Sequence, residues 1–171
     1  IFNYIYAQEI IIIDTAEETS EKQALIILNG FGDSKKNRMI QQEFFKSQGY
    51  DLFIPEYVKR KSIDLTISSF SYFYNKYKLD DYKEVKFLCY IIGGYVLNKH
   101  IEENGRGKIT TIIYDRSPIQ ERAPKVVAKR IPLVVKILYG KVIFDFSRIQ
   151  INSLNNADSL RIGVIVENKA T

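Results

Sequence analysis

The chain has few of the residues that metal sites and covalent frameworks require. Its 171 residues contain one cysteine, one histidine and no tryptophan. A single cysteine excludes an internal disulfide framework and a cysteine-only zinc site, and a single histidine leaves few ligands for a catalytic zinc. We therefore expect neither metal catalysis nor a bound cofactor.

The sequence also has neither a large excess of charge of one sign nor a long apolar run. Lysine and arginine exceed aspartate and glutamate by 25 to 20, a net charge of +5. With no nucleic-acid motif beside it, this excess does not indicate nucleic-acid binding. No run reaches the roughly 18 to 20 apolar residues that a transmembrane segment needs. The length predicts a single domain over residues 1–171, whose core needs no disulfide or metal.

The first residues allow two interpretations. Residues 1–7 have the pattern of the tail of an export signal cleaved after Ala7, where a small residue precedes the polar Gln8. They also fit an N-terminal strand that continues to Ile13. The strand is the simpler interpretation and favours a cytoplasmic protein, whereas the signal would make the protein exported.

From residue 24 to residue 114, apolar β-branched runs alternate with helical patterns. The run at residues 24–28 is continuously apolar, which is typical of a strand covered on both faces. Such alternation predicts a three-layer α/β fold, in which a mainly parallel sheet is flanked by helices. The predicted strands are residues 24–28, 51–55, a run from residue 85, 108–114 and, later, 160–166.

The helical patterns predict which side chains face the sheet. After the N-cap residue Ser34, a helix that stops near Gly49 would turn inward Met39, Ile40, Phe44 and Phe45. After Ser62, the spacing of four and three residues indicates a core stripe rather than a cofactor site, formed by Ile63, Ile67, Phe70, Tyr74 and Tyr77. A third helix ends near Gly105 and buries Val96, Leu97 and Ile101.

Residues 118–150 interrupt the alternation. Prolines recur there, and the apolar runs 131–138 and 142–146 are interspersed with lysines and arginines. This pattern predicts a lid or inserted segment whose apolar side covers a pocket. A weaker alternative is contact between this segment and an anionic membrane surface or a protein partner.

The most informative stretch is residues 85–97, which read as a strand, a very tight turn and a helix. Two glycines, Gly93 and Gly94, follow the apex of the turn, which is Ile91. In an α/β hydrolase this apex carries the nucleophile. Isoleucine has no hydroxyl, thiol or carboxylate, so the turn predicts a fold without predicting a reaction.

Two motifs resemble those of the α/β-hydrolase superfamily, and the likeness extends over roughly residues 24–171. Residues 28–34 look like the family's His-Gly-x-Gly loop, with Asn29 where histidine is usual. Residues 89–94 stand where the family has Gly-x-Ser-x-Gly-Gly. Cys89 and Gly93 satisfy the requirement for small residues two positions before and after the apex.

The resemblance implies a role for each position of the site. An oxyanion hole would use the backbone N–H groups of Phe31 and Ile92. The family's acid follows the seventh strand, and Lys169 stands where aspartate would be commonest. Glu167 or, after the preceding strand, Asp115 could substitute only weakly. The family's histidine follows an eighth strand, and we expect the C-terminal strand and helix to be missing here. His100 lies in the helix after the elbow, where surface exposure or helix packing is the simpler interpretation.

Other nucleophiles have simpler structural explanations. Cys89 is the strongest alternative, although its position suits a small side chain packed beneath the turn. Ser34 reads as an N-cap and Ser117 as a turn residue before proline.

Binding residues are predicted at the carboxyl edge of the sheet. Arg116 and Arg122 would grip a carboxylate or phosphate, unless their loop is only a solvated connection with local ion pairs. The other candidates for ligand contact are Asn29, Gly30, Phe31, Tyr90 and Ile92.

We therefore expect a non-catalytic α/β-hydrolase-like domain that binds a small molecule or a protein partner. The alternatives are a hydrolase of an ester, thioester or related acyl substrate that uses Cys89 or a loop serine, and a fragment of a larger protein with no separate function.

Overall fold

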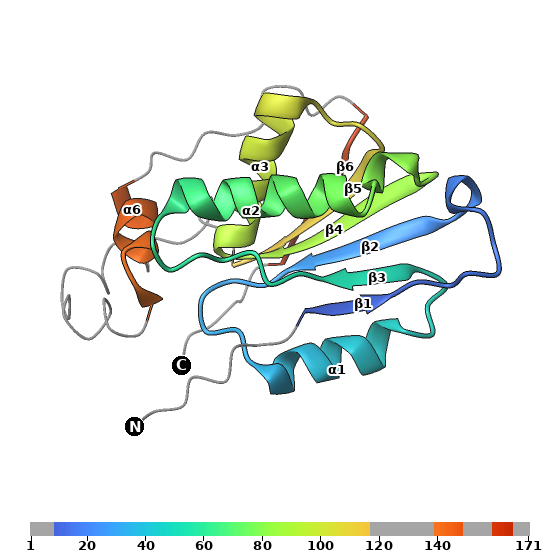
Figure 1. Ribbon diagram of the computed structural model, residues 1–171, viewed down its shortest axis with the longest axis horizontal. Coiled ribbons are helices and arrows are strands. Elements are labelled where there is room, and N and C mark those ends of the chain that lie inside the picture. Colours follow the sequence, from blue (N-terminus) through green and yellow to red (C-terminus); the bar gives the residue numbers. More distant parts are fainter. Residues whose placement is uncertain (1–8, 117–138, 149–158, 166–171) are drawn as a thin grey trace.

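The computed structural model describes residues 9–116, 139–148 and 159–165, which contain a six-stranded sheet in the order β1-β3-β2-β4-β5-β6 (Figure 1). Strand β1 pairs antiparallel with β3, and the other neighbouring strands are parallel. The strands are β1 (Ile10–Ile12), β2 (Gln23–Leu28), β3 (Asp51–Ile54), β4 (Glu84–Tyr90), β5 (Ile109–Asp115) and β6 (Arg161–Ile165). The predicted alternation and the mainly parallel sheet are confirmed.

Helices cover both faces of this sheet. Helices α2 (Ile63–Lys76) and α3 (Ile92–Asn104) lie on one face, and α1 (Lys35–Phe45) lies on the other (Figure 1). Beside α2 and α3 lies the short helix α6 (Val142–Arg148), and two 3₁₀ turns are η1 (Thr19–Glu21) and η2 (Leu79–Asp81). Ser34 and Ser62 begin α1 and α2 as predicted, because each hydroxyl accepts a backbone N–H bond at 3.2 Å.

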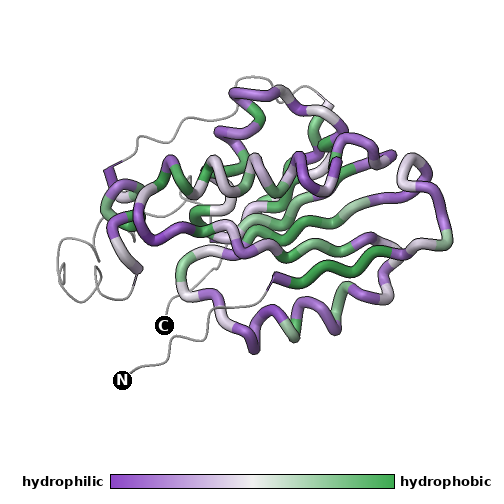
Figure 2. Tube along the Cα trace, in the orientation of Figure 1, coloured by the Kyte–Doolittle hydropathy of each residue, from purple (hydrophilic) through white to green (hydrophobic). Residues whose placement is uncertain are grey.

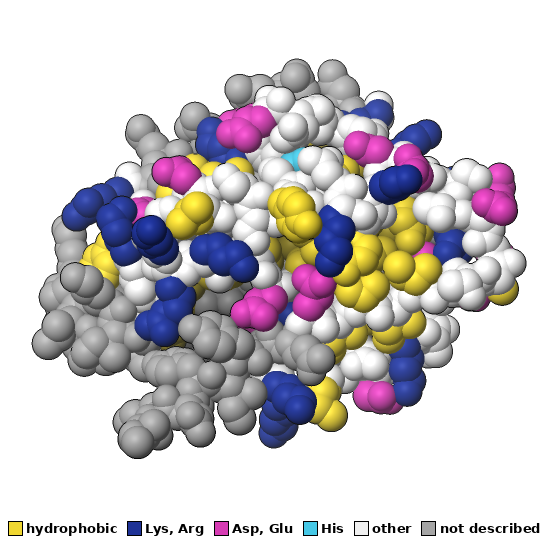
Figure 3. Space-filling view, in the orientation of Figure 1, with side chains coloured by type: hydrophobic (Ala, Val, Ile, Leu, Met, Phe, Trp, Pro, Cys, Tyr) yellow, Lys and Arg dark blue, Asp and Glu magenta, His cyan; other side chains and the backbone are white. Residues whose placement is uncertain are grey.

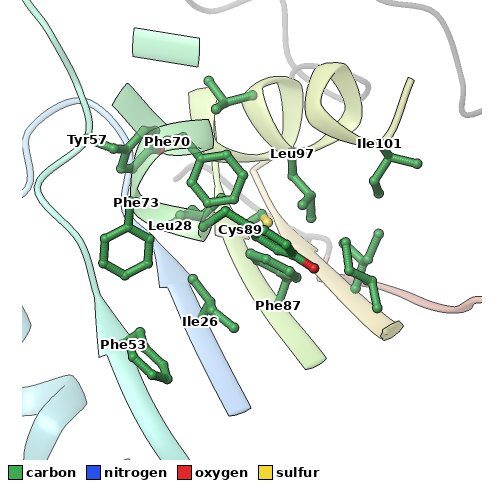
Figure 4. Close-up of a cluster of buried hydrophobic side chains, with 14 of the residues drawn as sticks. Ile26, Leu28, Phe53, Tyr57, Phe70, Phe73, Phe87, Cys89, Leu97 and Ile101 are labelled. Atoms are coloured by element: carbon green, nitrogen blue, oxygen red, sulfur yellow. The ribbon is translucent and has the colours of Figure 1, made fainter. Parts of the chain in front are cut away.

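The main core lies between the sheet and the pair α2 and α3. Strand β2 is buried on both of its faces from Ala24 to Leu28, and hydrophobic residues concentrate along the central strands (Figure 2). Aromatic side chains of β3, α2 and β4 meet in this layer (Figure 4). The predicted stripe on α2 is confirmed, with Ile63, Phe70 and Tyr74 buried and Ile67 and Tyr77 packed against the cluster.

The orientation predicted for α1 is wrong. Its apolar side chains Met39, Ile40 and Phe44 are 53%, 58% and 65% exposed, and only Phe45 packs against the sheet. The buried residue of α1 is Arg38, which is 4% exposed. Helix α1 is coloured mostly hydrophilic in Figure 2.

Hydrogen bonds of Arg38 explain this orientation. Its guanidinium donates to Asp33 Oδ2 at 2.6 Å and to the backbone carbonyls of Ile54 and Pro55 at 2.9 and 3.1 Å. These bonds satisfy a buried cation and bind α1 to the end of β3. The inward position of Arg38 therefore determines the rotation of α1. The apolar side chains of the helix consequently face solvent.

Replacing Arg38 by methionine would leave the carboxylate of Asp33 buried without its cation. We expect Arg38→Met to lower the free energy of unfolding by about 3 to 5 kcal/mol. Urea unfolding measures this loss. The exposed neighbour Lys36 is the matched control, and Lys36→Met should change the same quantity by less than about 0.5 kcal/mol. Equal, small effects of both substitutions would show that Arg38 does not anchor the helix.

Candidate functional site

The predicted elbow is present at the carboxyl end of β4. Strand β4 ends at Tyr90, α3 begins at Ile92, and the residue between them has φ 47° and ψ −109°. Positive φ is unfavourable for a β-branched side chain and costs of order 1 to 3 kcal/mol. Ile91 therefore occupies the strained apex in the place where the sequence predicted it.

Two glycines allow the chain to approach itself closely around this apex. A Cβ atom added to Gly93 would lie 2.5 Å from the carbonyl oxygen of Leu28, and one added to Gly30 would lie 3.0 Å from Cβ of Ile91. Any larger residue would push the loop after β2 away from the elbow. Because neither glycine has a side chain, the elbow and this loop can pack directly against one another.

The elbow forms one wall of a pocket of about 410 Å³. Among the predicted ligand residues, those that line it are Asn29, Gly30, Phe31, Tyr90 and Arg116. The strained Ile91 also lines it. Helix α1 adds three side chains that the sequence analysis missed, namely Asn37, Ile40 and Gln41. Ile40 and Gln41 reach the pocket because Arg38 sets the rotation of the helix.

Asn29, which stands where the resembling family has histidine, is fixed by neutral hydrogen bonds. Its side-chain amide and that of Gln41 exchange two hydrogen bonds at 2.8 and 2.9 Å. Its backbone carbonyl accepts a hydrogen bond from the buried hydroxyl of Tyr57 at 2.7 Å. These contacts give the pocket a rigid amide wall that carries no charge.

One carboxylate, that of Asp33, lines the pocket, and a second, that of Asp115, precedes the lining residue Arg116. Burial raises the pKa of Asp33 above its usual value, although the guanidinium of Arg38 opposes this shift. One oxygen of Asp33 and one oxygen of Asp115 are buried without a hydrogen-bond donor among the described residues. Asp115 also accepts the N–H of Ile91 at its backbone carbonyl, at 3.2 Å, so the end of β5 is tied to the elbow.

Arg116 follows directly after β5 and reaches the pocket from a backbone with φ 50°. Its Nε lies 3.7 Å from Asp115 Oδ1, and its side chain is 51% exposed. Ile92 is fully buried at the start of α3 and does not line the pocket. Arg122, Ser117 and Glu167 lie outside the described residues.

The two candidate nucleophiles within the described residues are held in structural roles. Cys89 is fully buried, and its sulfur lies in the core beneath the elbow among Leu28, Phe87 and Leu97 (Figure 4). Burial raises the pKa of this thiol well above its usual value, so the neutral thiol is favoured. The hydroxyl of Ser34 accepts the N–H of Asn37.

The described part of residues 118–150 packs beside the pocket. The ring of Phe31 lies 5.8 Å from that of Tyr139 and 5.9 Å from that of Phe146. Phe146 also contacts Tyr95 of α3 at 5.9 Å between ring centroids. Helix α6 is therefore attached to the pocket loop through aromatic rings, and the remainder of the predicted lid lies outside the described residues.

The described residues provide neither a cluster of metal ligands nor a membrane-spanning helix. These residues contain no group of three or more histidine, cysteine, aspartate or glutamate side chains that could hold a metal ion. No helix among them combines the length and the hydrophobicity needed to cross a membrane.

No protein-family model and no curated protein matches the sequence. Solved structures do match: a lipase from Bacillus licheniformis has a TM-score of 0.62 at 15% identity, covering 95% of this chain and 73% of its own. One of the metagenome-derived lipolytic enzymes LipS and LipT has a TM-score of 0.55 at 10% identity, covering 72% of this chain. The chain has the α/β-hydrolase fold.

The shared fold does not extend over the whole length of these proteins. The chain spans 51% of the metagenome-derived enzyme, and 39% and 41% of two other matched structures, a bromoperoxidase and an esterase. At such identities the likeness concerns the fold alone. Within the α/β-hydrolase fold, the elbow apex is the nucleophile position, and here that apex is Ile91.

His100 lies away from this site, packed between α2 and α3. It is 3% exposed, its Nδ1 lies 3.3 Å from both Ser71 Oγ and Asn104 Nδ2, and its ring contacts Phe70 and Tyr74. Helix packing, one of the two interpretations offered for this residue, is what the structure shows. Burial lowers the pKa of His100, and the negative charge of Asp80 only partly opposes this shift.

This lowered pKa predicts a pH dependence of stability. The unfolded chain takes up a proton on His100 at higher pH than the folded chain, so the free energy of unfolding should fall as pH drops below about 6.5. The slope from this one group is at most about 1.4 kcal/mol per pH unit. Urea unfolding between pH 7 and pH 5.5 should show a smaller slope for His100→Gln. Identical slopes would contradict the assignment.

The strain at the elbow predicts unequal costs for two adjacent isoleucines. Ile92→Ala removes a fully buried side chain and should lower the free energy of unfolding by about 2 to 5 kcal/mol. Ile91→Ala removes a β-branch from positive φ, and the relieved strain should hold its loss below about 1 kcal/mol. Ile91→Gly should be at least as stable as Ile91→Ala. Equal losses at both positions in urea unfolding would argue against strain at Ile91.

Proposed function

We propose that the chain is a non-catalytic α/β-hydrolase-like domain that binds a small ligand at the elbow pocket. The main observation behind this proposal concerns Ile91. Its backbone has the strained conformation of a nucleophile elbow, but its side chain cannot attack a substrate. Strain of this kind persists only where the surrounding structure over-determines it. A strained residue that forms part of a pocket wall supports a role for Ile91 in ligand binding.

The lining of the pocket favours a ligand with one acidic group and a small apolar part. Arg116 offers a planar guanidinium suited to a carboxylate or phosphate. The apolar side chains Ile40 and Ile91 face the same space, and the Asn29 and Gln41 amides provide neutral hydrogen bonding. The charge of Asp33 favours ligands whose acidic group lies at the Arg116 end.

The alternative is a hydrolase of an ester, thioester or related acyl substrate. It needs Cys89 or Ser34 to act as nucleophile, and both side chains have the structural contacts described above. A protein partner that binds through residues 118–150 is a further alternative. No contact among the described residues favours either over ligand binding.

The absence of a nucleophile predicts no specific acyl turnover. The purified chain and the double variant Cys89→Ala/Ser34→Ala should both hydrolyse p-nitrophenyl acetate, p-nitrophenyl butyrate and an acyl thioester no faster than buffer alone. Release of p-nitrophenolate or free thiol measures the rate. Turnover by the natural chain that the double variant loses would establish the hydrolase instead. Turnover that persists in the double variant would also contradict the non-catalytic proposal and would indicate another nucleophile.

Ligand binding is tested separately by unfolding in the presence of small acids. Benzoate and phenyl phosphate are suitable probes, because each joins an acidic group to an apolar ring. At a concentration of 100 times the dissociation constant, binding should raise the free energy of unfolding by about 2.7 kcal/mol. Arg116→Gln should abolish this gain, whereas the exposed Arg106→Gln should retain it. Stabilisation that is equal in both variants would exclude Arg116 as the acid-binding group.

A further inference from the structure

A second recessed surface runs along the outer side of α2, apart from the elbow pocket. A depression of about 670 Å³ lies between α2 and the segment that precedes it, and a smaller one of about 180 Å³ continues it. The two depressions share Glu56, Lys59, Ser69 and Tyr72, so they form one groove. We call this surface the α2 groove.

The floor of the α2 groove is apolar and has room for side chains. Leu65 and Tyr72 are 45% and 71% exposed, and they lie seven residues apart, on one face of the helix. Between them stand Ser68 and Ser69, whose small side chains leave space and offer hydroxyl groups. Leu65 and Tyr72 are about 10 Å apart along the helix axis, a spacing that suits two anchoring residues of a bound peptide.

One wall of the groove is basic. Lys59, Arg60 and Lys61 are consecutive and line the larger depression beside the carboxylate of Glu56, and the smaller depression adds Lys76 and Glu9. Within the described residues, neither Lys59 nor Lys61 has a carboxylate within 4.0 Å. Figure 3 shows Lys and Arg side chains gathered around the start of α2, with hydrophobic side chains exposed along the helix beside them.

The basic wall is held in place before any partner arrives. The buried hydroxyl of Thr66 accepts the N–H of Lys59 at 2.9 Å, and its proton is shared between the carbonyls of Ser62 at 3.0 Å and Lys59 at 3.2 Å. The carbonyl of Arg60 accepts the N–H of Val142 at 3.2 Å. A fixed backbone lowers the entropy lost when a charged partner binds.

We propose that the α2 groove binds an acidic peptide segment of a protein partner, with an aromatic or aliphatic anchor placed between Leu65 and Tyr72. Charge complementarity with Lys59 and Lys61 selects acidic side chains, and the apolar side chains of α2 select the anchor. A helix that binds a bilayer buries a continuous apolar face, whereas here Ser68 and Ser69 separate the exposed side chains of Leu65 and Tyr72. A peptide therefore fits this surface better than an anionic membrane does.

The probe is a short fluorescein-labelled peptide in which glutamates flank a central Leu-Phe pair. Fluorescence anisotropy with the full chain should show saturable binding that weakens as salt is added. Two control peptides should each bind about tenfold more weakly, one with glutamine in place of glutamate and one with serine in place of the Leu-Phe pair. Failure of the acidic peptide to bind would overturn the proposal.

Matched variants assign the binding to this surface. Lys59→Glu/Lys61→Glu and Tyr72→Ser should each weaken peptide binding about tenfold. The controls Lys36→Glu and Phe44→Ser change an exposed lysine and an exposed aromatic of α1, and they should leave binding unchanged. Unfolding midpoints of all variants confirm that each remains folded.

Two results would overturn the assignment even if the peptide binds. Equal affinities of groove variants and α1 controls would place the peptide elsewhere. Binding to phosphatidylserine vesicles that exceeds binding to the peptide, and that Lys59→Glu/Lys61→Glu abolishes, would identify a membrane surface instead. Ester turnover and benzoate binding involve a different site, so these results are independent of the function proposed for the elbow pocket.

Discussion

The contact between the elbow and the loop after β2 is the constraint on which the site depends. Gly93 leaves no room for a Cβ atom beside the carbonyl of Leu28, and Gly30 leaves almost none beside Ile91. Strand β4 is also fixed on both sides, by β2 and by β5. The backbone at Ile91 thus has no freedom to relax, and its positive φ is a consequence of these surroundings.

Because the strain arises from the surrounding backbone, the elbow conformation does not depend on a reactive side chain at the apex. In a nucleophile elbow, the strained turn serves to expose a reactive atom at the edge of the sheet. Here the same turn exposes the side chain of Ile91, which contributes surface and no reactivity. The pocket combines a recess, the guanidinium of Arg116 and the paired amides of Asn29 and Gln41, which are the groups that the proposed ligand binding would use. Binding and catalysis make separate demands on a fold, so a shared fold does not by itself assign either function.

The sequence predicted those features that depend on local patterns. The alternation of elements, the caps at Ser34 and Ser62, the core stripe of α2 and the elbow all follow from spacing or from glycine placement, and all are present. The side of α1 was predicted wrongly because hydrophobic periodicity ignores a buried arginine. Arg38 meets two carbonyls that lie 16 and 17 residues further along the chain, and no local pattern reveals such partners.

The same error hid part of the pocket. Once Arg38 faces the end of β3, Gln41 is brought beside Asn29, and the two amides exchange hydrogen bonds. The signal available in the sequence was the spacing of three residues between Arg38 and Gln41, which places them on one helix face. Reading that signal requires knowing that the polar face of α1 is the inner one. Site residues contributed by a misoriented helix are therefore the ones that sequence patterns miss.

Residues 55–61 connect the two recessed surfaces without making them one site. The hydroxyl of Tyr57 donates a hydrogen bond to the backbone carbonyl of Asn29 at the pocket, whereas Lys59 and its neighbours line the α2 groove. Coupling between two sites requires an element with two arrangements whose balance each ligand shifts. This segment is held by Tyr57 at one end and by Thr66 and Val142 at the other, all through hydrogen bonds to defined backbone groups. Because hydrogen bonds hold this segment at both ends, we expect the proposed pocket and the proposed groove to bind independently.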